Sequence, residues 1–528
     1  DRHQNILRFH RLCELDVNRS LKVLILKNLR RVKLWLFLIF ILTLLAYNFE
    51  NSRRRFKNTP PGPWANYIPF IGYLPFLNPQ KPEQSLTKLA EKYGKIFSLQ
   101  MGSIFTVVLS DATLMREAFK RDEFLGRAPL RVTHGIFHGY GLICIEGALW
   151  KDQRSLVQKW LRDLGMVKFG LKRELMQQRI MNGINNCISE FKSLHLNEVN
   201  PASVIMNAIG NIANDVVFGV TFDKNDETWK YLLHLQEEGV KLVGVNSGAN
   251  FLPFLRFLPD NKKNMKFLLS GIEATHKIYD GIVDECEKTL NTSECRDSIL
   301  RRFLLEKRDR EERNDGLANN CSRKQLNYLL ADMFGAALDT TSHTLRWYLL
   351  LIALNLDVQE KVYQEMKNHG LKEEYLLDDV AQLHYLKATI AETQRLKTVA
   401  PCGIPHGNPY TDTTLEGYYI PKNTMILPLI CAVHLDKTMW ENPEIYNPNR
   451  FIDSNDIFFT PSNFIPFQTG KRMCVGEELA KMVLQLFCAN VLLNFRIRPG
   501  QDAATWDLSG ISGLTLSPPD FQLIFEKR

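Results

Sequence analysis

The pattern of apolar and polar residues predicts a mainly helical chain. Apolar residues recur at helical spacing over long stretches, most continuously across residues 325–354. A helix of about 30 residues would be about 45 Å long, enough to cross a whole domain. Short strand-like segments occur near residues 96–110 and 418–429. The pattern therefore predicts one large, mainly helical body with small β-sheets.

Few features divide this body. No Ser/Gly-rich spacer and no internal repeat follows residue 60, and the strongly polar stretch 306–320 (EKRDREERNDGLANN) is typical of a solvated loop between helices. We therefore expect two regions. Residues 1–58 would form an N-terminal extension with a membrane anchor and a basic linker, and residues 59–528 would form a single large domain.

The anchor is predicted from the apolar run at residues 34–47 (LWLFLIFILTLLAY), which only Thr43 interrupts. The run is shorter than the roughly 20 residues of a typical span, but Lys and Arg stems on both sides could extend it. No small-residue cleavage site follows, which favours an anchor over a signal peptide. Residues 1–33 carry nine Lys and Arg and the residues just after the run carry four. By itself, this bias places the N-terminus in the cytosol.

A stiff segment, Pro60-Pro61-Gly62-Pro63, follows the basic cluster after the anchor. Consecutive prolines favour polyproline backbone, and Gly62 allows a turn. Such a segment could act as a hinge that holds the folded body at a fixed tilt from its anchor, or simply as a linker.

Composition narrows the class of protein. Hydrophobic residues make up 45% and charged residues 23% of the chain, which excludes a disordered, collagen-like or polytopic membrane protein. The 66 Lys and Arg outnumber the 58 Asp and Glu, a mild excess that suits an acidic partner or a membrane surface. The ten cysteines form no Cys-x-x-Cys pair, so reduced thiols are expected rather than a disulfide framework or a zinc site.

One cysteine lies in a specific motif. Residues 464–476 read FIPFQTGKRMCVG, so that Phe467, Gly470, Arg472, Cys474 and Gly476 match F-x-x-G-x-R-x-C-x-G. A helical stretch follows at once, and a helix N-terminus favours the thiolate of a cysteine just before it. Glycines on both sides let backbone approach a flat cofactor. A thiolate held in this way suits an iron atom, and Arg472 could pair with an acidic substituent of the cofactor.

These residues resemble the signature of the haem-thiolate monooxygenases, the cytochromes P450. The resemblance covers the chain from about residue 60 and implies the cytochrome P450 fold, with haem b as cofactor and Cys474 as the axial ligand of its iron. It also implies that Phe467, Arg472 and Gly476 contact the haem. Electrons would come from NADPH through NADPH–cytochrome P450 reductase, with cytochrome b5 as a possible second donor.

Further motifs follow in the family's order. Trp150 and Arg154 lie one helical turn apart, so both can donate to one carboxylate, and in the family this pair holds a haem propionate. Arg127, in Phe-Leu-Gly-Arg, and His406, in Gly-Ile-Pro-His, resemble two further propionate contacts. Without the resemblance, His406 would be interpreted as a structural histidine.

Residues 336–341 (AALDTT) resemble the oxygen-activation motif of the family. There, Thr340 would supply a hydroxyl beside the iron and Asp339 a carboxylate that relays protons from water. Local hydrogen bonding to the preceding turn is the simpler interpretation of a mid-helix threonine. Ala337 stands where the family usually has glycine, and its methyl group could tighten the oxygen groove.

Glu392 and Arg395 lie three residues apart on one predicted helix face, and Arg450 follows in Pro-Asn-Arg-Phe. Any such pair could be a weak surface ion pair. The resemblance implies instead a buried triad that supports the cysteine loop, with a structural role.

The resemblance also bears on location and partner. Microsomal members combine an N-terminal span, a basic cluster and a PPGP hinge, which implies attachment to the endoplasmic reticulum membrane with the domain in the cytosol. An Arg-rich N-terminus leaves a mitochondrial location as the alternative. An acidic reductase would bind a basic face, for which the candidates are Lys151, Lys159, Arg162 and Lys471.

The substrate is expected to be an apolar molecule of moderate size. By resemblance the pocket would draw on segments rich in apolar residues and glycine, at 127–137, 243–254, 333–340, 399–404 and 512–516. The stretches FGAALDTTSHTLRW, GIPHGN and GLTLSPP resemble insect microsomal enzymes of steroid hormone synthesis. That resemblance implies hydroxylation of an ecdysteroid precursor at carbon 25.

Other functions stay open at this point. Within the same fold, the alternatives are a xenobiotic or juvenile-hormone oxidase and a hydroperoxide isomerase or dehydratase that uses no external oxygen. From a different class, the alternative is a non-catalytic haem protein that binds a lipid. Retention of Asp339 and Thr340 favours the monooxygenase, since a pure binder needs no proton relay.

Overall fold

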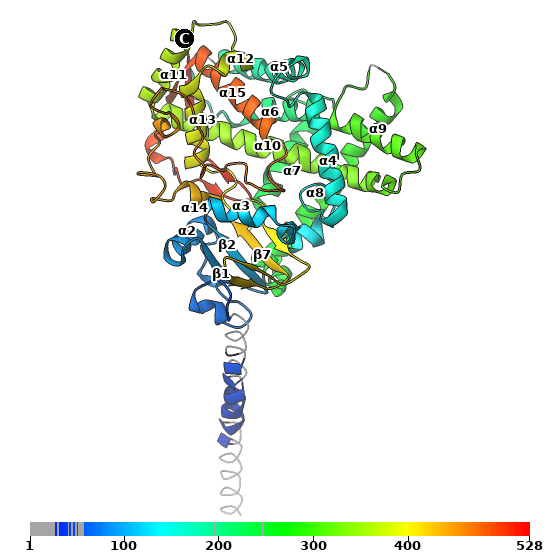
Figure 1. Cartoon of the computed structure of the whole chain (residues 1–528), viewed down its shortest axis with the longest axis vertical. Helices are drawn as coiled ribbons and strands as arrows, with labels where there is room; N and C mark the ends of the chain where they lie inside the picture. The colour runs from blue at the N-terminus through cyan, green and yellow to red at the C-terminus, as the bar shows by residue number, and fades with distance from the viewer. Residues whose placement is uncertain are drawn as a thin grey trace, which may run out of the picture.

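Helix α10 (Arg323–Leu354) runs through the middle of the molecule and organises the elements around it (Figure 1). The computed structural model describes residues 27–28, 31–40, 42–43, 46–47, 50, 57–194, 196–243, 248–292 and 294–528. The Ser322 side chain caps the start of α10 by accepting a hydrogen bond from the backbone N–H of Gln325. Most of its 32 residues are buried. The predicted long helix at 325–354 is confirmed.

Helices make up most of the body, as the sequence pattern predicts. They are α2 (Pro82–Tyr93), α3 (Ala112–Lys120), α4 (Gly147–Leu164), α5 (Leu171–Ser193), α6 (Ala202–Val217), α7 (Glu227–Val243), α8 (Pro259–Thr289), α9 (Ile299–Glu312), α10, α11 (Leu356–Asn368), α12 (Leu377–Val380), α13 (His384–Leu396), α14 (Ile430–His434) and α15 (Glu477–Asn494). Among them, α6 packs along α10 over a long contact, and α5 and α15 add further layers. The apolar core follows these contacts.

The largest β-sheet lies at the end of the body where the N-terminal segment emerges, whereas β11 (Leu523–Lys527) runs to the C-terminus at the opposite end (Figure 1). The largest sheet has the strand order β1-β2-β7-β4-β3. Its strands are β1 (Ile96–Met101), β2 (Ile104–Leu109), β3 (Gly126–Arg127), β4 (His406–Asn408) and β7 (Thr424–Pro428). Two-stranded sheets pair β5 (Thr413–Leu415) with β6 (Tyr418–Ile420), β8 (Phe495–Pro499) with β11 (Leu523–Lys527), and β9 (Ile511–Ser512) with β10 (Leu516–Ser517). Both predicted strand-like segments are therefore confirmed.

The proline segment is docked on the sheet. Ser98 of β1 donates its backbone N–H to the carbonyl of Pro61 at 2.8 Å and its hydroxyl to the carbonyl of Pro60 at 2.7 Å. A Cβ on Gly62 would collide with the Ser98 carbonyl, so this position requires glycine for close approach rather than for a turn. These hydrogen bonds therefore attach the hinge segment to β1.

The predicted loop at 306–320 is partly wrong, because α9 continues to Glu312. Its charged residues form pairs one helical turn apart, including Glu306 with Arg310 at 2.8 Å. Arg310 also forms an ion pair with Asp152 of α4 at 2.8 Å, and both side chains are largely buried. The charge run is therefore the solvated face of a helix whose inner side is anchored to α4.

The predicted anchor at 34–47 lies partly outside the described residues, since 41, 44 and 45 are not described. The described part is helical at 31–40, and its apolar side chains are exposed below the body (Figure 1). Within the described residues, no helix combines the length and the apolar character needed to cross a membrane.

The expected ion triad is present and is buried. Arg395 of α13 donates to both carboxylate oxygens of Glu392, at 2.7 and 2.8 Å, and neither side chain has any exposed surface. Arg450 donates to the same carboxylate at 3.4 Å. Glu392 also accepts the backbone N–H of Asn447 at 2.8 Å, so the carboxylate joins α13 to the segment around Arg450.

This triad reaches the cysteine loop through His434, a residue that sequence analysis did not single out. Arg395 donates to the backbone carbonyl of His434 at 2.8 Å, and the ring Nε2 of His434 accepts the backbone N–H of Ile465 at 3.0 Å. Burial, together with the charge of Arg395, lowers the pKa of His434 to about 3. The ring therefore stays neutral and keeps its acceptor nitrogen, which positions the start of the loop that carries Cys474.

We predict that Glu392→Gln destabilises the protein by about 3–5 kcal/mol, because it leaves the Arg395 guanidinium buried without its anionic partner. The free energy of unfolding from urea titration of the haem-loaded protein measures this change. Glu227→Gln is the matched control, since the Glu227 ion pair with Lys230 is exposed and its loss should change stability little. Equal effects of the two substitutions would contradict a structural role for the buried pair.

Candidate active site

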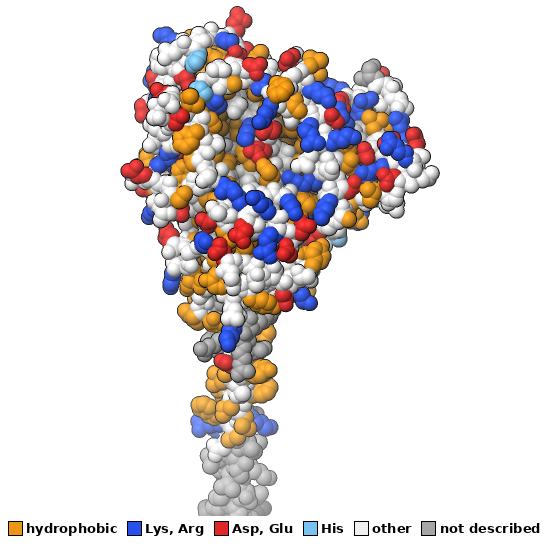
Figure 2. All heavy atoms as spheres, viewed as in Figure 1, with side chains coloured by type: hydrophobic (Ala, Val, Ile, Leu, Met, Phe, Trp, Pro, Cys, Tyr) orange, Lys and Arg blue, Asp and Glu red, His pale blue; other side chains and the backbone are white. Residues whose placement is uncertain are grey.

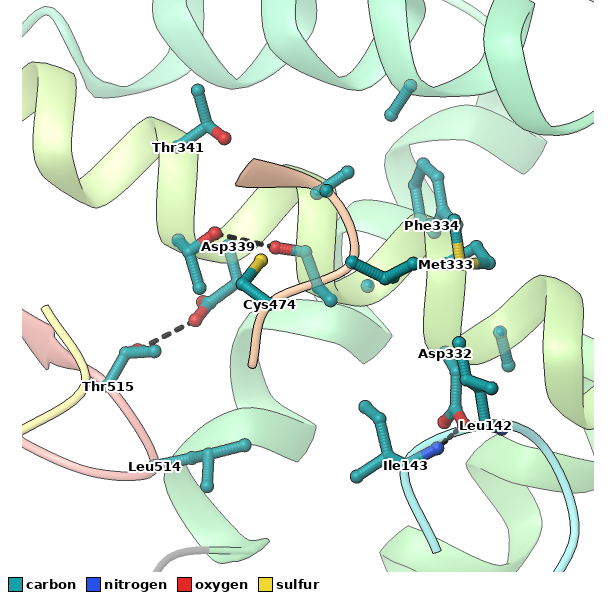
Figure 3. A pocket seen from close by; sticks show the side chains of 18 of the residues that line it. Leu142, Ile143, Asp332, Met333, Phe334, Asp339, Thr341, Cys474, Leu514 and Thr515 are labelled. Atoms are coloured by element: carbon teal, nitrogen blue, oxygen red, sulfur yellow. Dashed lines mark hydrogen bonds between the residues drawn. The ribbon is translucent and has the colours of Figure 1, made fainter. Parts of the chain in front are cut away.

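An internal cavity of about 470 Å³ lies between the cysteine loop, the middle of α10 and the loop at residues 141–143. Further walls come from α4, α6, α7, α8 and α15 and from the segments at 399–404 and 514–515, and most of the lining is apolar. Figure 3 shows Cys474 facing the stretch of α10 that carries Asp339, with Asp332 farther along beside Leu142 and Ile143. The sequence-predicted residues on the cavity wall are Arg127, Trp150, Arg154, Asp339, Thr340, Phe467, Arg472, Cys474 and Gly476.

The cysteine loop holds Cys474 with its side chain accessible from the cavity. Its backbone N–H donates to the carbonyl of Phe467 at 3.0 Å, which closes the loop. Gly470 has φ +82°, and a Cβ there would collide with the backbone of Phe119. Gly470 is therefore needed for contact with α3. Gly476, by contrast, has open space where a side chain would point.

Two opposing effects act on the Cys474 thiol. Burial raises its pKa, whereas the Gly476 backbone N–H and the Arg154 charge lower it. The backbone N–H at the start of α15 thus acts in the direction that the sequence predicts. A metal cation bound to the sulfur would act in the same direction, since a coordinating thiol loses its proton.

Three arginines meet at one side of the cavity. Arg472 donates to the carbonyls of Leu125 and Ile145, each at 2.6 Å, and Arg127 donates to the carbonyl of Ile143 at 2.7 Å. Arg154 donates to the carbonyl of Met473 at 2.7 Å. Their hydrogen bonds to these carbonyls fix the positions of the guanidinium groups, but carbonyls do not neutralise their charges.

The charges of these arginines are under-compensated. Burial, and then the neighbouring Arg127, lowers the pKa of Arg472 to about 8, and burial lowers the pKa of Arg127 to about 10. Glu146 provides only part of the opposing charge. The cavity therefore combines a sulfur ligand, apolar walls and a cluster of buried cations, which fits a flat iron cofactor with acidic substituents, such as haem with its two propionates.

Trp150 lies within this cluster. The Arg472 guanidinium is 4.4 Å from the centre of its ring and the Arg154 guanidinium is 5.8 Å from it. The structure thus brings Trp150 and Arg154 together as the helical spacing predicts, and it adds Arg472 of the cysteine loop to the same aromatic ring.

His406 is placed differently. It pairs with Arg127 across strands β3 and β4, but it does not line the cavity. Its Nδ1 lies 2.8 Å from the Phe124 carbonyl and its Nε2 lies 2.8 Å from the Gln468 side-chain amide, so protein groups occupy both ring nitrogens. Burial, and then Arg127, holds its pKa well below the usual range. As placed, His406 supports Arg127 and the cysteine loop from behind.

The oxygen-activation motif lies on the opposite wall. The Thr340 hydroxyl donates to the Ala336 carbonyl one turn earlier, at 2.7 Å. Asp339 accepts a hydrogen bond from the Thr515 hydroxyl at 2.7 Å (Figure 3). The methyl group of Ala337 also lines the cavity. The local bonding of Thr340 that the sequence suggested is therefore present, and its hydroxyl still borders the cavity.

Asp332 is a site residue that sequence analysis missed. One oxygen of its carboxylate accepts the backbone N–H groups of Leu142 and Ile143, at 2.6 and 2.8 Å. Burial raises its pKa to about 6. A carboxylate within an otherwise apolar stretch of a long helix was the available signal. The Asp332 carboxylate ties the loop at 141–143 to α10 and so shapes one end of the cavity.

Each segment that was predicted to form the pocket contributes residues to this cavity, except the segment 243–254. None of the described residues in that segment lines this cavity. The corresponding walls come from residues 232–240 of α7 and 267–279 of α8, because these two helices present their inner faces to the cavity while their connection lies outside it. Periodicity alone did not indicate this relative placement.

Comparisons with known proteins agree with the site. A family model described as Cytochrome P450 matches residues 60–525. Similar curated proteins include cytochrome P450 306a1 of Drosophila melanogaster, which is 39% identical with 89% of each chain covered. Cytochrome P450 18a1 of Drosophila melanogaster is 32% identical, covering 93% of this chain and 91% of the relative. Cytochrome P450 2U1 of Homo sapiens is 32% identical, covering 93% of each chain.

We predict that Asp332→Asn stabilises the haem-loaded protein at neutral pH. The asparagine oxygen can keep both backbone hydrogen bonds while the buried charge disappears. Because the folded-state pKa of about 6 lies above the ordinary value of 3.8, the wild type loses stability as pH rises between these values. The penalty is on the order of 2–3 kcal/mol and is fully present above about pH 6.

Melting temperatures of both proteins between about pH 4.5 and 7.5, in steps of about half a pH unit, test this. We expect the advantage of the Asp332→Asn variant to shrink toward the acid end. A difference that does not vary with pH would show that the carboxyl group does not titrate in this window.

Proposed function

The chain belongs to the cytochrome P450 family and is a haem-dependent monooxygenase, and from this premise we propose that it hydroxylates an ecdysteroid precursor at carbon 25. The observation that carries the proposal is the joint lining of one apolar cavity by Cys474, the arginine cluster and the Asp339–Thr340 pair. The finer assignments of cofactor contacts, substrate, partner and location below are parts of the same proposal.

When bound, haem supplies the activation of dioxygen, so that one oxygen atom enters a substrate C–H bond and the other leaves as water. We assign Cys474 to its iron as axial ligand, with haem b as the form of the cofactor. The guanidinium groups of Arg127, Arg154 and Arg472 would neutralise its propionates, together with the Trp150 indole N–H. Phe467 and Gly476 would border the ring, since both line the cavity.

On the wall formed by α10, Thr340 and Asp339 would deliver protons to the site. The Thr340 hydroxyl donates to the Ala336 carbonyl and borders the cavity, so it would have to turn away from that carbonyl to donate a proton into the cavity. Asp339 can take up a proton on one side and release it on the other, because it borders the cavity and is hydrogen-bonded to Thr515. These two side chains would deliver protons from the α10 wall of the cavity.

The shape of the cavity supports an elongated substrate. Its lining extends along α10 from Tyr328 to beyond Thr340, and these two residues are about 18 Å apart along the helix axis. Polar side chains, including Tyr328 and His276, belong to its lining, and most of the lining is apolar. A sterol with polar groups on its rings and an apolar tail matches this lining, with its tail toward Thr340. Carbon 25 lies on that tail.

A basic face supports binding of an acidic NADPH–cytochrome P450 reductase, with cytochrome b5 as a further candidate. Lys151, Lys159 and Arg162 are exposed on α4, and Lys471 is exposed on the cysteine loop. Figure 2 shows Lys and Arg side chains gathered on the face where α3 and α4 lie in Figure 1. Lys151 and Lys471 share Asp122 as a partner, so they lie close together. Electrons arriving here would have a short path to Cys474.

Exposed aromatic residues support attachment to the endoplasmic reticulum membrane. Trp64, Phe70 and Phe257 have 69%, 78% and 85% of their surface accessible. Their segments meet at the β1–β2 turn, where Gly72 pairs with Met101 and Ser103 donates to the Phe251 carbonyl. This patch lies at the end of the body from which the N-terminal helix emerges (Figure 1). Aromatic side chains favour such an interface.

We expect the dithionite-reduced, carbon monoxide-treated full chain to show the strongly red-shifted Soret band of thiolate-ligated haem. Cys474→Ala should lose this band because the sulfur ligand is gone. Cys488→Ala is the matched control, since Cys488 is a buried cysteine that does not line the cavity. A band typical of imidazole ligation in folded wild-type protein would refute the assignment of Cys474.

For the substrate, we predict conversion of the sterol ketodiol precursor to its 25-hydroxy product by the purified chain with reductase and NADPH. Mass spectrometry of the product gives both the added oxygen and its position. Thr340→Ala should lower product formed per NADPH consumed by about tenfold or more, since a positioned proton donor contributes about 10²–10⁴-fold. Turnover of fatty acids or xenobiotics but not of the ketodiol would favour the other oxidases of this fold.

A further inference from the structure

We propose that His343 and Thr515 form the outer part of a proton path that enters the active site through Asp339. Both residues lie outside the motifs that identify the family, and they come from different parts of the chain. His343 is on α10, one turn after Asp339, and Thr515 lies in the loop just before β10. The proposal rests on the monooxygenase chemistry and does not depend on which substrate is used.

The three side chains form a continuous hydrogen-bonded chain. The Thr515 hydroxyl donates to the Asp339 carboxylate at 2.7 Å, and His343 Nδ1 lies 3.2 Å from the same hydroxyl oxygen. A hydroxyl has only one proton to donate, so the imidazole Nδ1–H must be the donor to Thr515. His343 Nδ1 is also 3.6 Å from the other carboxylate oxygen of Asp339. The geometry thus defines both the direction of each bond and the tautomer of the ring.

The chain of side chains leads away from the cavity. Asp339 and Thr515 line the cavity, whereas His343 does not. The His343 side chain keeps 16% of its surface accessible, and its Nε2 makes no hydrogen bond to any described residue. The ring is therefore positioned to receive a proton from water at Nε2 and to pass on the one at Nδ1.

Charged groups around the ring come from two helices. Asp339 and Arg346 belong to α10, and Glu237 and Lys241 belong to α7. Burial is the main effect that lowers the pKa of His343, so the ring is neutral at physiological pH. A neutral ring can relay a proton without holding it. The half-exposed Glu237 and Lys241 mark the outer end of the path.

The loop that carries Thr515 is held in place. The Trp347 indole N–H donates to the Leu516 carbonyl at 2.9 Å, and the Leu516 N–H donates to the Val399 carbonyl at 2.8 Å. These bonds attach the loop to α10 and to the segment after α13. The Thr515 hydroxyl is therefore presented to Asp339 by a rigid neighbour, as a positioned relay requires.

The proton balance is simple. Hydroxylation, RH + O2 + 2e− + 2H+ → ROH + H2O, consumes two protons per turnover, and the reductase supplies the electrons. For each proton, water protonates His343 Nε2, the Nδ1 proton moves to the Thr515 oxygen, and the Thr515 proton moves to the Asp339 carboxylate. Asp339 then releases its proton toward Thr340. The starting state is restored when the Thr515 hydroxyl rotates back and the ring returns to its Nδ1–H tautomer, with water taking the Nε2 proton and supplying one at Nδ1, so that the reset itself neither gains nor loses a proton.

Thr515→Val and His343→Phe test the path, since each keeps a similar volume and removes one relay group. In the purified full chain with reductase, we expect product per NADPH to fall about tenfold with a matching rise in hydrogen peroxide. The dissociation constant for the ketodiol, or for lauric acid if the wild type does not turn over the ketodiol, should be unchanged. Thr515→Ser should restore coupling, and the double variant should be no worse than either single variant.

Ser517→Ala is the control, because it removes a hydroxyl from the same loop outside the cavity. Wild-type coupling in both relay variants would overturn the proposal. Equal loss of coupling and of substrate affinity would also overturn it, since the residues would then only shape the pocket.

A second readout is independent of turnover. With ¹⁵N-labelled histidine, the His343 signal can be identified among the twelve histidines by its loss in His343→Phe. We expect the Nδ1–H tautomer in the wild type and a shift toward Nε2–H in Thr515→Val, where the acceptor is absent. An Nε2–H tautomer in the wild type would contradict the donor direction on which the path depends.

Discussion

The constraint on which this structure depends is the burial of positive charge without equivalent negative charge. Arg127, Arg154 and Arg472 point their guanidinium groups to one side of an internal cavity, where burial and mutual repulsion disfavour them. Backbone carbonyls fix their geometry but leave the charge in place. A cofactor with two carboxylates would offset this charge, and its binding would then also stabilise the loop around Cys474.

In a second buried cluster, around Glu392, groups of the protein itself neutralise the charges. Glu392 is bonded to Arg395 on both oxygens and accepts further bonds from Arg450 and Asn447. Through His434 it reaches the backbone at Ile465, where the cysteine segment begins. The two clusters therefore differ in charge balance. The cluster around Glu392 has its charges paired within the protein and supports the fold, whereas the arginine cluster keeps an excess of positive charge and borders the cavity.

On the wall formed by α10, the helix supplies hydroxyl and carboxylate groups, and loops from elsewhere in the chain supply hydrogen-bond partners for the carboxylates. Thr340 is held by its own helix, whereas Asp339 and Asp332 are each bonded to a loop from elsewhere in the chain. Helix α10 therefore binds and positions both the loop at 141–143 and the loop before β10. Residues of both loops line the cavity, so their positions shape it along α10.

By itself, the sequence determined the elements and the motif-bearing residues: the long helix, the two strand regions and nine cavity residues from Arg127 to Gly476. These follow from local periodicity and fixed spacing, which short-range geometry controls. Tertiary structure alone decided what required distant segments to meet. It placed His406 behind Arg127, raised the Cys474 pKa by burial and joined Asp332 to residues 142 and 143. Burial and long-range hydrogen bonds are properties of the packed chain, so no local pattern could reveal them.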